Sequence, residues 1–127
     1  MARKWNGMDW IRLSTRCAIY HRDGFRCVYC DAEGGSLGEG LSLDHVEAHH
    51  HGGGNHPENL VTCCLDCNKS KQHASMRAWF ARLRIKGVET TNLSASIARR
   101  RRKPLDRDAG RDIACRRRPS TRRQMRA

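Results

Sequence analysis

Long apolar runs are missing from this sequence, and its apolar content is low. Hydrophobic residues make up 38% of the 127 residues, which predicts one small domain with a limited core. No stretch approaches the length that a helix needs to cross a membrane. The first residues lack the apolar run of a secretory signal, and no segment repeats another. We therefore expect a protein of the reducing cytoplasm, where cysteines bind metal more often than they form structural disulfides.

Acidic residues are also scarce, and the resulting charge is unevenly placed. The chain holds 25 Lys or Arg against 13 Asp or Glu, a formal net charge of +12. Residues 98–127 hold 13 of these cations against 3 acidic residues, so nearly the whole excess lies there. A solvated tail that aids solubility is one interpretation. Because 12 of the 13 cations are arginines, which suit bidentate phosphate contact, we favour a nucleic acid as partner.

Cysteine, by contrast, is abundant, with seven residues in the chain. Cys27 and Cys30 form one Cys-x2-Cys pair, and Cys64 and Cys67 form a second. Two such turns supply the four soft ligands of a tetrahedral zinc site. Only Cys64 has the required spacing to Cys67, so its neighbour Cys63 is the spare. A closed four-thiolate site has no open position, which predicts a structural zinc ion.

The segment between the cysteine pairs should fold into two short ordered pieces. Residues 41–46 alternate apolar and polar side chains, as a half-buried strand does. A glycine-rich turn follows, and Pro57 begins a second short segment. Residues 64–71 are expected to begin a helix. The sequence thus predicts a small α+β domain in which two short elements and a helix surround the cysteines.

Helices are also expected on both sides of this segment. Ser14 is a candidate cap for a helix that continues to Tyr20 or Arg22. Further along, one apolar helical face is predicted by the spacing of Met76, Trp79, Phe80 and Leu83. A last weak helix is indicated by Leu105, Ala109 and Ile113.

Polar side chains with catalytic potential lie between or beside the cysteine pairs. Asp44 and His45 end the first strand, while Asn59 and Asn68 follow in the second segment and the helix. A hard cation such as magnesium takes oxygen ligands, which the Asp44 carboxylate and the Asn68 amide provide. A neutral His45 can accept a proton from water. Together these groups suit metal-dependent hydrolysis of a phosphodiester bond.

At these positions the chain resembles the HNH endonuclease family, over roughly residues 14–85. The matching motifs are Cys27-x2-Cys30, Leu43-Asp44-His45-Val46, Gly52-Gly53, Asn59-Leu60-Val61, Cys64-x2-Cys67-Asn68 and Lys71. The resemblance implies a treble-clef-like ββα-metal finger that consists of a two-stranded hairpin and a helix. It further implies that His45 is the general base, that Asp44 and Asn68 hold a catalytic Mg²⁺ or Mn²⁺ ion, and that Asn59 braces the loop and orients the His45 imidazole. The expected substrate is double-stranded DNA, cut to leave 5′-phosphate and 3′-hydroxyl ends.

The chain departs from the common family pattern in three places. Asn68 stands where some members have the final histidine, Ala48 stands where many have proline, and the run His49-His50-His51 replaces more usual polar or basic residues. Short, stand-alone members of this type resemble those encoded by tailed phages, where they accompany DNA packaging. We therefore expect a phage-encoded protein of the bacterial cytoplasm, with phage packaging proteins as further partners.

Three regions are expected along the chain. Residues 1–13 would form an N-terminal arm, residues 14–87 the nuclease domain, and residues 88–127 a basic, partly helical or disordered tail. A non-catalytic zinc-ribbon DNA-binding protein is the main alternative, because the cysteines and the basic tail would suffice for it. It would leave Asp44, His45 and the two asparagines without a role. A degenerate nuclease that is held by a partner is a further alternative.

Overall fold

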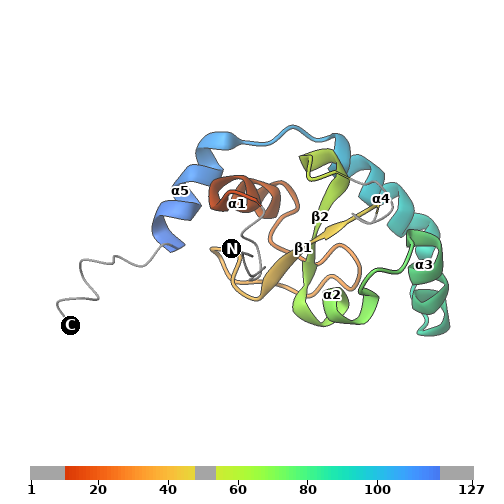
Figure 1. The fold of residues 1–127 in the computed structure, drawn as a ribbon. Helices are drawn as coiled ribbons and strands as arrows, with labels where there is room; N and C mark the ends of the chain where they lie inside the picture. The colour runs from red at the N-terminus through yellow and green to blue at the C-terminus, as the bar shows by residue number, and fades with distance from the viewer. Residues whose placement is uncertain (1–10, 48–53, 118–127) are drawn as a thin grey trace, which may run out of the picture.

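The computed structural model describes residues 11–47 and 54–117. Figure 1 shows a central two-stranded hairpin with helices on several sides of it. The elements in chain order are α1 Leu13–Arg22, β1 Leu41–His45, the 3-10 helix η2 Pro57–Asn59, β2 Leu60–Cys64, α2 Leu65–Lys71, α3 Met76–Ile85, α4 Thr90–Arg102 and α5 Arg107–Arg117. None of the helices in these ranges combines the length and apolar content that a membrane crossing requires.

The hairpin and the helix after it form the centre of the fold. β1 and β2 pair antiparallel, with Leu41 opposite Cys64 and His45 opposite Leu60. α2 begins directly after β2, and the Cys64 thiol caps it by accepting a hydrogen bond from the Cys67 N–H. α2 packs against both strands. This arrangement confirms the predicted small α+β fold with a ββα unit.

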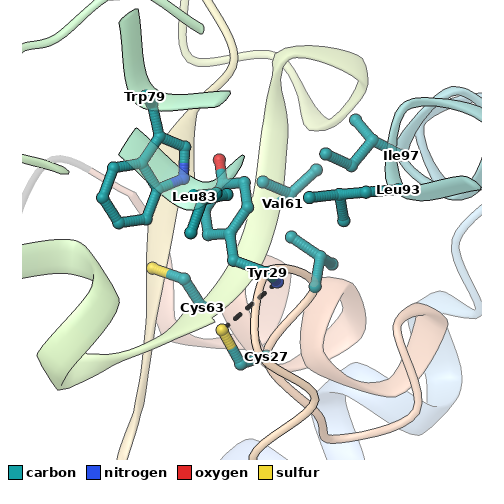
Figure 2. Close-up of a cluster of buried hydrophobic side chains, with 9 residues drawn as sticks. Cys27, Tyr29, Val61, Cys63, Trp79, Leu83, Leu93 and Ile97 are labelled. Atoms are coloured by element: carbon teal, nitrogen blue, oxygen red, sulfur yellow. Dashed lines mark hydrogen bonds between the residues drawn. The ribbon is translucent and has the colours of Figure 1, made fainter. Parts of the chain in front are cut away.

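A hydrophobic core lies between the hairpin and helices α3 and α4 (Figure 2). The Tyr29 ring meets the Trp79 ring edge to face, with centroids 5.5 Å apart and an interplanar angle of 81°. Trp79 and Leu83 are buried, which confirms the apolar face predicted for α3. Leu93 and Ile97 of α4 complete the same cluster. Helix α4 is therefore packed against this core and does not project from the domain as a separate tail.

Helix α1 is joined to the hairpin by buried polar contacts. The Tyr20 hydroxyl donates to the Leu41 carbonyl at 3.1 Å. The Arg22 guanidinium donates to the Leu60 carbonyl at 2.7 Å and forms a buried ion pair with Asp23 at 2.8 Å. Because these groups are buried, their mutual hydrogen bonds offset the desolvation that burial imposes. They fix the end of α1 at the start of β2.

Helix α5 packs against α1 through a glycine. A Cβ atom added to Gly110 would lie 2.4 Å from the Ser14 carbonyl oxygen, so only glycine permits this approach of the two helices. Ile113 is buried beside Cys17 in the same contact. The basic residues after position 97 thus also contribute to the packed structure, up to Arg117 at the end of α5.

Two expectations about helix ends were wrong. Arg12, and not Ser14, is the N-cap of α1, and no side chain caps that end. Burial of residues 17–20 places this helix, so tertiary packing overrides the cap signal. The last helix begins at Arg107, so Leu105 lies before it. Most of the expected N-terminal arm, the histidine run at 49–51 and residues 118–127 lie outside the described residues.

Candidate metal centre and active site

Four thiols from two turns converge at one point. Cys27 and Cys30 lie in a turn before β1, Cys64 ends β2, and Cys67 lies in the first turn of α2. Their sulfur atoms all lie within 4.8 Å of one another, with 3.7 Å between those of Cys30 and Cys64. With Zn–S bonds of about 2.3 Å, the corners of a tetrahedral site are about 3.8 Å apart. The four cysteines can therefore hold a zinc ion with little movement.

Backbone N–H groups donate hydrogen bonds to two of these sulfur atoms, and such bonds stabilise a negatively charged thiolate. The N–H groups of Tyr29 and Cys30 both donate to the Cys27 sulfur at 3.4 Å, and the Cys67 N–H donates to Cys64 at 3.3 Å. Burial raises the pKa of Cys27 to about 11. Burial also opposes ionisation of Cys64, but the Cys67 N–H and neighbouring thiols outweigh it and lower the pKa of that thiol. Since zinc binds the thiolate, the amide contacts favour the ligand form.

Cys63 lies in the core, away from the four thiols. It is fully buried beside Val61 and Trp79, and burial raises its thiol pKa strongly. Successive residues of a strand point to opposite faces, so Cys63 and Cys64 cannot both face the same site. The structure therefore brings together the cysteines with the x2 spacing and leaves out the spare one.

A cavity lies where the end of β1 meets α2. It has a volume of about 420 Å³. Three of the sequence-predicted site residues, Asp44, His45 and Asn68, line it together. The described residues that line it are Arg16, Leu41, Ser42, Leu43, Asp44, His45, Leu65, Asn68, Gln72 and His73. The candidate base and the two candidate cation ligands thus share one polar space.

Asp44 is held by two buried partners that sequence reasoning did not assign to it. The Tyr29 hydroxyl donates to Asp44 Oδ2 at 2.5 Å, and Lys71 Nζ lies 3.1 and 3.2 Å from the two carboxylate oxygens. All three residues are at most 5% exposed. Burial raises the pKa of Asp44, while the Lys71 charge and the Tyr29 hydrogen bond oppose that shift. The ion pair keeps the carboxylate oriented at the cavity wall.

His45 is contacted by an asparagine that the motif does not include. Its Nε2 lies 2.7 Å from Asn55 Oδ1. Because an amide oxygen can only accept, this contact favours the tautomer with the proton on Nε2. The lone pair that can accept a proton then lies on Nδ1. Asn55 follows the glycine-rich turn, and no spacing rule indicated it.

Asn59 spans the loop between the strands. Its Oδ1 accepts from the Glu47 N–H at 2.9 Å. Its Nδ2 donates to the carbonyls of Glu47 at 3.1 Å and of Gly54 at 2.8 Å. Three hydrogen bonds from one side chain thus join Glu47 and Gly54, the two ends of the loop. Asn55 directly follows Gly54 in the chain.

Asn68 presents its amide toward the strand. Its Nδ2 lies 3.3 Å from the Ser42 hydroxyl, which serves as acceptor. The described residues provide no donor to its side-chain oxygen Oδ1, which is of the ligand type that a hard divalent ion takes.

These features define a ββα domain with four clustered thiols and a polar cavity at the junction of hairpin and helix. A family model described as HNH endonuclease matches residues 27–74, which contain both cysteine pairs, the hairpin and α2. No curated protein and no solved structure matches the chain. This match over residues 27–74 supports a function of the nuclease kind.

Proposed function

We propose that this protein is an endonuclease that hydrolyses DNA phosphodiester bonds. The observation that carries the proposal is the shared cavity of Asp44, His45 and Asn68 in a domain that the HNH endonuclease model matches. Each supplies a different kind of group: a carboxylate, an imidazole and an amide. Phosphodiester hydrolysis needs a base for the attacking water and charge stabilisation at the phosphate. A binding module would need neither.

His45 acts as the general base through Nδ1. The contact of Nε2 with Asn55 supports this role, because it holds the ring and the tautomer. Asn59 acts indirectly, since it ties the loop ends at Glu47 and Gly54 and so keeps Asn55 in place.

Asp44 and Asn68 hold the catalytic cation. A bound Mg²⁺ or Mn²⁺ ion would polarise the phosphate and stabilise the leaving oxygen. The protein's own contribution is orientation, because Lys71 and Tyr29 fix the Asp44 carboxylate and Ser42 fixes the Asn68 amide. Such contacts to metal ligands determine their direction and basicity.

A structural zinc ion on Cys27, Cys30, Cys64 and Cys67 would join the turn before β1 to the start of α2. This crosslink would hold Tyr29 in its contact with Asp44, because Tyr29 lies between two of the ligands. The binding free energy of such a site is part of the folding free energy. Zinc therefore supports the cavity without reacting in it.

The partner we propose is double-stranded DNA, which the excess of arginines after residue 97 would attract. A phage-encoded origin and a place beside packaging proteins are also part of the proposal, and they rest on the resemblance to short phage-type members alone. The domain limits of residues 14–87 and 88–127 are likewise proposed.

The proposed roles are tested by single-turnover cleavage of plasmid DNA across magnesium concentration. His45→Ala should lower the rate by about 100- to 10,000-fold, as expected for loss of a general base. Added magnesium should not restore it. Asp44→Ala and Asn68→Ala should instead need more magnesium for the same rate.

His21→Ala is the matched control, because His21 is an exposed histidine at the end of α1 and outside the cavity. It should cut at the wild-type rate. Equal rates for His45→Ala and His21→Ala would show that His45 is not the base. DNA binding by a wild-type protein that never cuts would favour the zinc-ribbon alternative.

A further inference from the structure

An open cleft lies between the carboxyl end of α4 and the end of α1, and the proposed nuclease mechanism does not use it. Its volume is about 630 Å³. Among the described residues, five cationic side chains and one carboxylate line it. The lining residues are Arg22, Asp23, Gly24, Ser96, Arg99, Arg100, Arg102 and Lys103.

At the floor of the cleft, the carboxylate charge of Asp23 is balanced by a buried ion pair. Asp23 is paired with Arg22 at 2.8 Å, and both side chains are at most 1% exposed. The same carboxylate accepts the Thr62 N–H at 2.9 Å and lies 4.0 Å from Arg100. Its single negative charge is therefore shared by two arginines. Among the described residues that line the cleft, no other carboxylate balances Arg99, Arg102 and Lys103.

The wall of the cleft carries the unbalanced charge. Within the described part of the chain, the side chains of Arg99, Arg102 and Lys103 form no hydrogen bond or ion pair. On α5 the pattern differs, because Arg111 pairs with Asp108, and Arg116 lies 3.3 Å from Asp112. Arg99, Arg102 and Lys103 are thus available for an external anion, whereas Arg111 and Arg116 of α5 have acidic neighbours.

Cations at a helix end also have a simple structural role. They interact favourably with the free carbonyls of the last turn. That role does not require the cations to converge on a cleft. It also does not explain why unpaired cations are kept side by side, since like charges repel unless an anion lies between them.

We propose that this cleft binds the phosphates of the DNA on which the proposed nuclease acts, so the inference rests on that function. Arg99 and Lys103 are four residues apart, or about 6 Å along the helix. One strand of DNA carries a phosphate about every 3.4 Å along its axis. The wall is therefore long enough to contact at least two phosphates of one strand, which a DNA backbone provides and a single small anion does not.

The test compares two triple variants that remove the same formal charge. Arg99→Gln/Arg102→Gln/Lys103→Gln alters the cleft wall, and Arg107→Gln/Arg111→Gln/Arg116→Gln alters α5. Both are made in the His45→Ala background so that the DNA stays intact. Binding to a fluorescently labelled duplex is measured by anisotropy over a series of salt concentrations, with zinc content and circular dichroism as checks of folding.

Loss of about two phosphate contacts should lower the slope of log K against log salt by about 1.8 in the cleft variant. The α5 variant should keep a slope close to that of its parent. Equal changes in both variants would assign the effect to net charge and overturn the proposal, as would an unchanged slope in the cleft variant. Cleavage of plasmid by the full chain tests the nuclease proposal separately, so an inactive protein with the expected slopes would refute that proposal alone.

Discussion

The buried pair of Asp44 and Lys71 gives the sharpest prediction about stability. Lys71 Nζ lies 3.1 Å from the Asp44 carboxylate, and the two side chains are 1% and 6% exposed. Lys71→Met keeps most of the side-chain volume but removes the charge. The carboxylate would then remain buried with only the Tyr29 hydroxyl as a strong partner.

The expected cost follows from this burial. Removing one partner of a buried ion pair costs about 3–5 kcal/mol, because the other charge remains without compensation. Total stabilities are about 5–15 kcal/mol, so the loss should be a large fraction of the whole. Asp44→Asn/Lys71→Met removes both charges and should recover much of the loss. Lys69→Met on the exposed side of α2 should stay within about 0.5 kcal/mol of wild type.

The assay is urea denaturation followed by circular dichroism, at a fixed zinc concentration so that metal binding contributes equally. Magnesium is left out, because a cation on Asp44 would change the comparison. A loss below about 1 kcal/mol for Lys71→Met would refute the reasoning. So would a double variant that is no more stable than Lys71→Met alone.

Three further predictions concern zinc, helix packing and alkaline pH. Cys64→Ser should lose zinc in elemental analysis and fail to fold, whereas exposed Cys115→Ser should keep wild-type zinc content; equal zinc in both would exclude this ligand set. Gly110→Ala should destabilise the protein by about 1–3 kcal/mol in urea denaturation, since the new Cβ would lie 2.4 Å from a backbone oxygen of α1; the gain normally expected of alanine in a helix would contradict that contact. Burial raises the pKa of Tyr20 to about 12, so its contribution is present below pH 10 and is lost as pH rises to about 12, at about 1.4 kcal/mol per unit of pKa shift. Tyr20→Phe should remove this part of the alkaline loss of stability, and an identical pH profile for both proteins would show that Tyr20 does not cause it.

Local patterns predicted the part of the fold that local chemistry determines. The x2 spacing correctly selected Cys64 over Cys63 as a candidate ligand. The structure supplies the reason: neighbouring residues of a strand point to opposite faces, so only one of the two can face the Cys27 and Cys30 pair. The apolar spacing of α3 correctly indicated which side of that helix enters the core. Both features depend on residues a few positions apart, and periodicity reports such relations directly.

Contacts between distant parts of the chain were not predictable in the same way. Tyr29 and Lys71 meet at Asp44 only because the turn before β1 and helix α2 fold against the same strand. The contact of Asn55 with His45 joins residues on either side of a glycine-rich segment that has no periodicity in the sequence. The packing of Gly110 on α1 joins residues about 90 positions apart. A single sequence contains no signal for such pairs.

The most direct test of the nuclease assignment is incubation of the purified, zinc-loaded protein with supercoiled plasmid, with and without magnesium. We expect nicked or linear DNA in the presence of magnesium and intact supercoiled DNA in its absence. DNA that stays supercoiled at every magnesium and manganese concentration, with a correctly folded protein bound to it, would contradict the assignment.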